Sequence, residues 1–423
     1  MSSELPSYRQ AAELVSAYAA QLGRLRPAVE RVELGRAPGR VLARPLLADH
    51  DQPPFARSTR DGFACRAAEA SAHVPLELAG ATRAGEPASG PLPPGAAWEI
   101  MTGAAVPQGA DAVMMVEHVE AGGGHVRLRK SRSIEEGENI VAQGAQARQG
   151  DELLQAGAAI GFGQVALAAA CGHGALEVYA RPRVAILATG DELVPVKVTP
   201  GPGQIRNSNG PMLAAMVVAA GAEPWLLPTA ADNAQALDTA LYNAADADFL
   251  LITGGVSAGK FDLVEPALAR AGARFHFTGV MIQPGKPIVF GELDRKSSAP
   301  HSPRPNRPLP FFGLPGNPVS SAVTFLLFAA PVLAALQGRL EAGPHFALAR
   351  LSPTAQKKGK PGLTRFLPAQ CTFGAAGEVP EVGFVSWQGS GDISALARCN
   401  CFLVIPEDAP ALEPGAVVRI LLP

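Results

Sequence analysis

Hydrophobic and polar positions follow two alternating periods in the middle of the chain, from about residue 176 to residue 337. Uninterrupted apolar runs at Val184–Ala188 and Phe249–Thr253 are typical of strands that are buried on both faces. The segments Gly210–Ala220 and Leu263–Arg270 instead have the character of helices. Strands that alternate with helices predict a parallel-rich sheet between two helical layers, and therefore a three-layer α/β domain.

The longest apolar run is Val319–Leu336, which carries no charged residue over 18 positions. That length reaches the lower limit for a membrane span. The run contains Pro331, and it begins directly after Asn317 and Pro318, which suit an N-cap and a first helical position. We therefore predict a buried helix of the α/β domain and no membrane partner.

The pattern of apolar and polar residues differs on either side of this domain. Residues 46–145 show short alternating runs with many Gly and Pro residues, which predict a β-rich domain. Residues 338–423 have the same character and predict a β-barrel-like domain. We assign residues 7–45 and 146–175 to one N-terminal mixed linker domain in which the β-rich domain is inserted. The predicted fold class is a multidomain α/β plus β chain.

Two local signals refine this outline. Ser7-Tyr-Arg-Gln10 is a capping box that predicts a helix through about residue 25. The Pro/Ser/Arg-rich stretch 294–309 stands between the strand-like runs Ile288–Leu293 and Leu309–Gly313. We therefore expect an exposed excursion from a hairpin there, and not a domain linker.

Composition and charge exclude some classes of function. A hydrophobic content of 47% and a charged content of 17% fit a globular protein of 423 residues, long enough for two to four domains. The net charge of −2 provides no field that would recruit nucleic acid. Five cysteines without metal-ligand spacing, and an N-terminal segment without an export signal, indicate a cytoplasmic protein.

Three of the strand-like runs end in loops that are rich in glycine and polar residues. One loop is Gly254-Gly-Val-Ser-Ala-Gly-Lys-Phe-Asp262, where backbone amides and Lys260 suit an anion and Asp262 suits Mg²⁺. The others are Thr189-Gly-Asp-Glu192 and Pro315-Gly-Asn-Pro-Val-Ser320. Because carboxyl ends of parallel strands meet at one edge of a sheet, we expect one crevice for a phosphorylated ligand.

Three further side chains are candidates for chemistry. Lys286 stands between Pro284-Gly285 and Pro287, which restrict its backbone and suggest a positioned cation. Asp61 precedes a glycine, so it is either a plain turn residue or a loop carboxylate presented to a ligand. Thr102 stands at the end of another strand-like run. Of the adjacent Asp191 and Glu192, only one is expected to face the crevice.

These motifs, taken together, resemble the MoeA family of molybdopterin molybdenumtransferases, which includes the gephyrin E domain. The resemblance runs from about Ser7 to Pro423, and its six motifs stand in the family's order: Pro53–Ala64, Ile100–Ala104, Thr189–Leu193, Gly254–Asp262, Pro284–Pro287 and Gly313–Ser320. It implies the Mg²⁺-dependent insertion of molybdate into adenylylated molybdopterin, with release of AMP and molybdenum cofactor. It also implies an elongated homodimer of four-domain subunits, with the active site between the α/β domain of one subunit and residues 46–145 of the other.

The resemblance assigns roles to particular residues. The catalytic set is Asp61, Thr102, Glu192, Asp262 and Lys286, and Mg²⁺ is held by Asp262, Glu192 and Asn207. The remaining substrate-binding residues are Gly254, Gly255, Ser257, Lys260, Pro315, Gly316, Asn317, Pro318, Ser320, Arg365 and Ser390. Expected partner proteins are a molybdopterin adenylyltransferase and molybdoenzyme chaperones.

Four positions depart from the family pattern. Val141 and Pro368 replace expected arginines, and Gln146 and Asn207 replace expected acids. Two alternatives therefore stay open. One is a catalytically impaired paralogue or scaffold that binds molybdopterin without turnover. The other is a molybdopterin adenylyltransferase, which shares the α/β architecture but is a single short domain.

Overall fold

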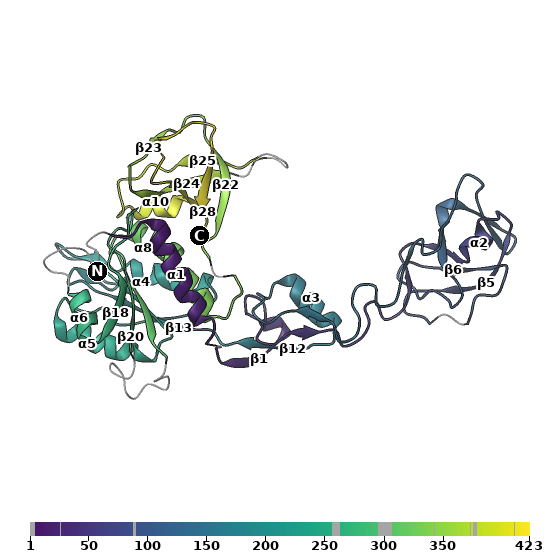
Figure 1. Cartoon of the computed structure of the whole chain (residues 1–423), viewed down its shortest axis with the longest axis horizontal. Coiled ribbons are helices and arrows are strands. Elements are labelled where there is room, and N and C mark those ends of the chain that lie inside the picture. Colours follow the sequence, from purple (N-terminus) through teal and green to yellow (C-terminus); the bar gives the residue numbers. More distant parts are fainter. Residues whose placement is uncertain are drawn as a thin grey trace.

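The computed structural model of the chain describes residues 5–25, 27–87, 90–255, 263–294, 307–341, 343–372, 374, 379–409 and 411–423. The subunit is elongated, with a small β-rich unit at one end and the α/β and C-terminal units at the other (Figure 1). A narrow mixed unit joins the two ends. The predicted multidomain α/β plus β class and the elongated shape are confirmed.

A six-stranded mixed sheet forms the centre of the α/β unit. Its strands lie in the order β16 (Glu223–Leu226), β13 (Arg183–Ala188), β17 (Phe249–Thr253), β21 (Leu309–Leu314), β20 (Val289–Leu293) and β18 (Ala273–Phe277). The first four are parallel, and the last two join antiparallel. Leu293 pairs with Leu309, so the stretch between them leaves from a hairpin as predicted; residues 295–306 lie outside the described residues.

Helices cover both faces of this sheet. One face packs on α5 (Ala234–Asn243) and α6 (Val264–Arg270). The other packs on α4 (Asn209–Ala219) and on one long helix, made of α8 (Pro318–Thr324), the π-helical turn η4 (Phe325–Ala329) and α9 (Ala330–Leu336). The long helix is apolar enough to cross a membrane, with a mean hydropathy of 2.1, but 83% of that window is buried inside the protein. The predicted core helix is thus confirmed.

The first helix, α1 (Tyr8–Leu22), begins at the predicted capping box. The Ser7 hydroxyl accepts from the Gln10 amide at 3.3 Å, and the Gln10 side chain accepts from the Ser7 amide at 2.8 Å. The buried face of α1, including Val15 and Leu22, belongs to the core of the α/β unit, where α1 packs on α9. The expected mixed domain therefore does not include this helix. The apolar stripe of α1 predicts that one face of the helix is buried, but it does not predict which unit of the protein packs on that face.

The mixed unit and the β-rich unit are built from short strands. In the mixed unit, β1 (Val29–Glu33) pairs with β12 (Ala175–Tyr179) and β2 (Leu46–Leu47) with β11 (Glu152–Leu154), beside α3 (Phe162–Ala170). The β-rich sheet has the order β7 (Ala112–Met115), β4 (Gly62–Cys65), β6 (Ala96–Ile100), β5 (Leu76–Thr82), β9 (His125–Leu128) and β8 (Val119–Gly122). The short pair β3 (Arg57–Ser58) and β10 (Ile140–Val141) lies at its base.

The C-terminal unit is a closed barrel. Pairing proceeds through β24 (Thr364–Thr372), β25 (Glu381–Phe384), β22 (Phe346–Leu351), β28 (Val417–Leu421) and β26 (Cys401–Ile405), and β26 returns to β24. A short strand before the long helix, β19 (Ile282–Gln283), also pairs with β24. The barrel is therefore attached to the α/β unit next to the Lys286 segment.

Candidate functional site

A crevice of about 530 Å³ lies at the carboxyl ends of β13, β17 and β21. The chain passes from β13 to β16 on one side and then to β17 on the other, so the strand order reverses here. Ligands of open α/β sheets bind at such a reversal. The predicted residues that line it are Glu192, Asn207, Gly254, Gly316, Asn317 and Pro318, whereas Ser257, Lys260 and Asp262 lie outside the described residues.

Gly254 allows two strand ends to meet at the floor of the crevice. Its φ is +93°, and a Cβ atom there would lie 2.5 Å from the carbonyl oxygen of Thr189. Only glycine combines this backbone conformation with so close an approach. The backbone of Gly254 thus lines the crevice directly above the end of β13.

Asn209, at the start of α4, donates hydrogen bonds to two different segments that line the crevice. Its side-chain amide donates to the Thr253 hydroxyl at 2.8 Å and to the Gly316 carbonyl at 2.7 Å. The residue is 8% exposed, and its carbonyl oxygen has no partner among the described residues. Since a buried unpaired acceptor is costly, this oxygen is available to a ligand or a cation.

Asn207 lines the crevice, and its side-chain oxygen already has one partner. Its side-chain oxygen accepts from the Gly210 amide at 2.9 Å and so caps the first turn of α4. The amide oxygen that is free in the crevice belongs to Asn209. The sequence held a signal for this, because Asn209 is the first helical residue directly beside the strand ends.

Glu192 lines the crevice, whereas its neighbour Asp191 does not. Asp191 accepts from the Asp232 amide at 3.0 Å, and Asp232 accepts from the Asp191 amide at 3.3 Å. One of the two adjacent acids therefore faces the crevice, as expected. The second exposed carboxylate beside it, Asp232, was not among the residues that we expected from the sequence.

The C-terminal barrel closes one side of the crevice. The Ser390 hydroxyl accepts from the Asn317 side-chain amide at 3.0 Å, and the Ser390 carbonyl accepts from the Val319 amide at 3.0 Å. The Asn317 side-chain amide and the Val319 backbone amide are thus both paired with Ser390. Asn317 makes no side-chain cap, and Ser320 is only 4% exposed, within the first turn of α8.

Lys286 and Arg365 lie outside the lining of the crevice. The Lys286 side chain is exposed and makes no ion pair with a described residue. Arg365 donates to the Gln283 side chain at 2.9 Å and to the Lys358 carbonyl at 3.0 Å, and burial lowers the pKa of its guanidinium. Arg365 therefore fixes the start of the segment that carries Lys286, and does not reach the crevice.

Asp61 and Thr102 form a pair in the β-rich unit. The amide of Thr102 donates to one Asp61 carboxylate oxygen at 2.6 Å, and its hydroxyl donates to the same oxygen at 2.8 Å. These two bonds lower the pKa of Asp61. Asp61 is followed by Gly62, where a Cβ atom would lie 1.9 Å from the Met114 carbonyl oxygen.

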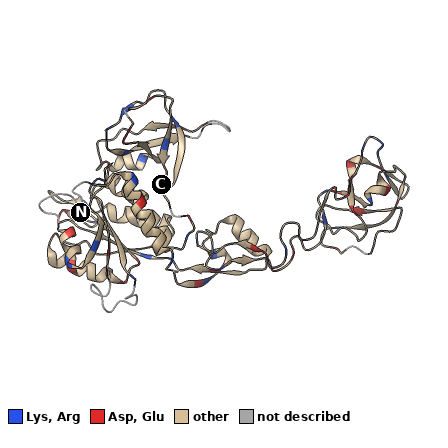
Figure 2. Cartoon of the chain, viewed as in Figure 1, with Lys and Arg blue, Asp and Glu red and all other residues tan. Residues whose placement is uncertain are grey.

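Within one subunit this pair is remote from the crevice, because the β-rich unit lies at the far end of the molecule (Figure 1). Basic and acidic residues are interspersed along the ribbon of all the units (Figure 2). Within one subunit, the two halves of the predicted catalytic set therefore lie far apart.

Replacing Thr102 by valine should raise the pKa of Asp61 towards its ordinary value. The backbone bond would remain while the hydroxyl bond is lost, so protonation of Asp61 would begin at a higher pH than in the wild type. A carboxyl-carbon NMR titration measures this shift. Asp392 is the internal control, because its pKa is lowered by the amides of Ala395 and Gln388. An unchanged Asp61 titration would mean that the hydroxyl bond is absent in solution.

Comparison with known proteins decides the family. Profiles of the MoeA N-terminal region (domain I and II), of a probable molybdopterin binding domain and of the MoeA C-terminal region (domain IV) match residues 7–172, 185–335 and 354–422. A molybdopterin molybdenumtransferase of Nostoc sp. is 33% identical over 99% of this chain and 94% of its own. The chain belongs to the MoeA family.

Other members of the MoeA family agree in sequence and in structure. The molybdopterin molybdenumtransferase of Bacillus subtilis is 34% identical, over 90% of this chain and 87% of its own. A crystal structure of the molybdopterin biosynthesis moeA protein from Pyrococcus horikoshii matches with a TM-score of 0.78 and 28% identity. It covers 99% of this chain and 100% of that one, so the likeness extends to all the units.

Two of the departures from the MoeA pattern lie in regular structure. Val141 pairs with Arg57 in the β3–β10 ladder, and Pro368 pairs with Phe402 within the barrel. Neither position holds a cation in this chain. The nearby Arg365 does not replace one in the crevice, because it donates to Gln283 before the Lys286 segment. These positions are the observations that favour an impaired member of the MoeA family.

The crevice has the donors that a magnesium ion requires. No group of three or more His, Cys, Asp or Glu side chains that could hold a metal occurs within the described part of this MoeA chain. Mg²⁺, however, keeps several waters and needs only one or two carboxylates beside phosphate oxygens. Glu192 and the unpaired amide oxygen of Asn209 are donors of this kind. The residues present therefore fit the ion.

Proposed function

We propose that this chain inserts molybdate into adenylylated molybdopterin and releases AMP and molybdenum cofactor. The observation that carries the proposal is the crevice at the strand reversal, with glycine backbone, a carboxylate and an unpaired amide oxygen on its walls. The activity named for the relatives, over nearly the whole chain, supports it. A cytoplasmic location accords with five free cysteines.

The chain's own residues suggest how the substrate would be held. The exposed backbone at Gly254 and Gly316 would receive the phosphates, as glycine-rich loops at strand ends do. Glu192 and Asn209, with Asp262 beyond the described residues, would hold Mg²⁺. When bound, the ion supplies positive charge to the phosphate oxygens. Lys286 would neutralise molybdate, since its ammonium makes no ion pair with a described residue.

Asp61 would act as a charged acceptor and not as an acid. Its lowered pKa keeps the carboxylate ionised at neutral pH, and Thr102 fixes one of its oxygens. The other oxygen would accept a proton or a hydrogen bond from the substrate. Because this pair is remote from the crevice of its own subunit, the proposal includes a homodimer in which each active site takes residues from both copies.

Anaerobic incubation with adenylylated molybdopterin, molybdate and Mg²⁺ tests the activity. We expect AMP release that depends on molybdate. Binding of the pterin nucleotide without AMP release would instead favour the scaffold alternative, which the Val141 and Pro368 departures motivate. The adenylyltransferase alternative would instead require transfer of the AMP group of ATP to molybdopterin, with release of pyrophosphate.

Mixing two inactive variants tests the shared active site. Asp61→Asn and Glu192→Gln each remove one half of every site in their own homodimers. A mixed dimer retains one intact site, formed by Glu192 of the first variant and Asp61 of the second. After subunit exchange, about a quarter of the wild-type activity should return. If the mixture stays as inactive as its components, the site does not span two subunits.

A further inference from the structure

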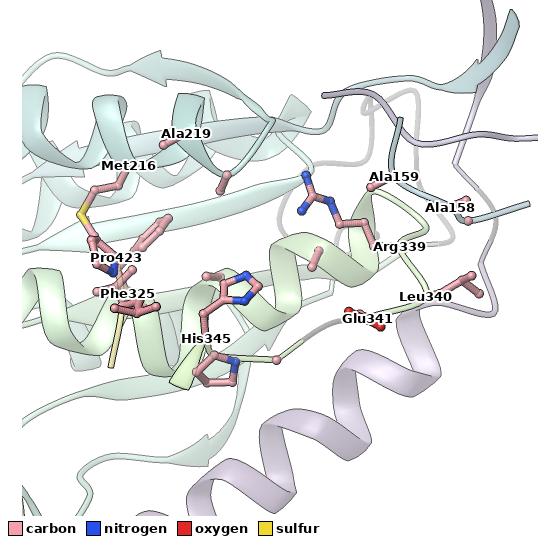
Figure 3. Close-up of a pocket in the computed structure, with 18 of the residues that line it drawn as sticks. Ala158, Ala159, Met216, Ala219, Phe325, Arg339, Leu340, Glu341, His345 and Pro423 are labelled. Carbon is pink, nitrogen blue, oxygen red and sulfur yellow. The ribbon is translucent and has the colours of Figure 1, made fainter. Parts of the chain in front are cut away.

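A second cavity, of about 720 Å³, lies apart from the crevice. It forms where three units meet, and the two cavities share no lining residue. The mixed unit contributes Gly157–Ala159, the α/β unit contributes α4 and the long helix, and the C-terminal unit contributes His345 and Pro423. Figure 3 shows this cavity with its lining side chains.

One end of the cavity carries a cation, Arg339, that makes no ion pair with a described residue. Arg339 follows the long helix, and its Nε atom is buried with no hydrogen-bond partner in the described part of the chain. No described carboxylate lies within 4.0 Å of the guanidinium, although Glu341 and the C-terminal Pro423 line the same cavity. Burial lowers the pKa of Arg339. An unpaired, partly desolvated guanidinium is costly unless an anion pairs with it.

The other end of the cavity is apolar. Met216 and Ala219 of α4 face Phe325 and Leu326 of the long helix. Phe325 and Leu326 belong to the π-helical turn η4, and such turns are frequent at functional sites because they displace side chains from the regular helix. In Figure 3, Arg339 lies at one end of the cavity, Met216 and Phe325 lie at the other, and His345 lies between them.

We propose that this cavity binds a small amphiphilic anion, with its charged head on Arg339 and its apolar body between Met216 and Phe325. The volume is within the range of small-molecule sites, and an apolar wall with a single cation suits a carboxylate or sulfonate on a ring system. The bound anion contacts all three units. It also contacts the two helices that begin at the crevice with Asn209 and Pro318.

Two fluorescent probes of similar shape test the proposal on the full-length protein. 8-Anilinonaphthalene-1-sulfonate carries the anionic head, and N-phenyl-1-naphthylamine lacks it. We expect saturable binding of one sulfonate probe per chain. Arg339→Gln should weaken that binding about tenfold or more, because a charge-assisted contact is lost, and should leave the uncharged probe unaffected. Arg44→Gln, at an exposed arginine of the mixed unit, is the matched control.

A second pair of variants tests the apolar end. Ala219→Trp fills the cavity and should reduce the binding of both probes. Val218→Trp changes the adjacent, exposed residue of α4, which does not line the cavity, and should leave both unchanged. Thermal unfolding by circular dichroism identifies any variant that fails to fold, and the α4 pair decides the question if Arg339→Gln does not fold.

Three results would overturn the proposal. The first is equal affinity of the sulfonate probe for the wild type and a folded Arg339→Gln. The second is a crystal structure with that probe bound elsewhere on the subunit. The third is the absence of saturable binding to the wild type, which would be the outcome if a second copy of the chain fills the cavity.

Discussion

Replacing Lys286 by alanine is expected to raise the molybdate concentration at half-maximal turnover on the order of 30-fold, which corresponds to a charge-assisted contact of about 1.5–3 kcal/mol. Lys286 is exposed and has no ion-pair partner among the described residues, so its ammonium is available to an oxyanion. Its segment is held in place, because Arg365 donates to Gln283 three residues earlier. A molybdate titration at saturating pterin nucleotide measures the change.

Two variants control this result. Lys286→Arg should restore only part of the affinity, because a wide planar guanidinium does not replace a compact ammonium. Lys197→Ala removes another exposed lysine of the same unit, which is not in the predicted catalytic set, and should change nothing. If Lys286→Ala keeps the wild-type half-saturation and loses only pterin affinity, the lysine belongs to the phosphate site.

The second large effect is expected for Gly254→Ala. An alanine would hold a φ of +93° and place its Cβ atom 2.5 Å from the Thr189 carbonyl oxygen, so the ends of β13 and β17 would separate. Backbone strain and overpacking together should lower the free energy of unfolding by about 2–5 kcal/mol. Binding of the pterin nucleotide should also be lost, because the floor of the crevice moves. Urea denaturation and nucleotide titration are the measurements.

Gly203→Ala separates the two causes. Gly203 has a similar φ of +78°, but no atom lies within 4 Å of the position of its Cβ. This variant should show the backbone strain alone, with a smaller loss of stability and with nucleotide binding retained. Equal losses in both variants would mean that the close approach to Thr189 contributes nothing.

The elements of the α/β unit could be predicted closely because their signals are local. The apolar run at Phe249–Thr253 gives β17 with the same bounds, and the capping box at Ser7 starts α1 as predicted. The predicted helix Gly210–Ala220 differs from α4 by one residue at each end. In each case the pattern depends on neighbours along the chain, and tertiary packing does not override it.

The site could be predicted only in part, because its details depend on contacts between distant segments. Glycine and carboxylate at strand ends indicated the crevice correctly. Nothing in the sequence shows that Ser390 of the barrel pairs with Asn317, or that the free amide oxygen is that of Asn209 and not Asn207. Which of these polar groups are paired depends on packing between segments that are distant in the sequence.

The place of α1 in the core of the α/β unit has a consequence for biosynthesis. This helix is translated first, but the sheet that it packs on begins only at Arg183, and the long helix beside it ends at Leu336. The mixed and β-rich units are therefore synthesised while the apolar face of α1 is still uncovered. The β-rich unit, whose strands all lie within one stretch, can fold on the ribosome, whereas the α/β unit must wait for its last helix. The apolar face of α1 thus stays uncovered until the strands and the long helix that it packs on have been translated.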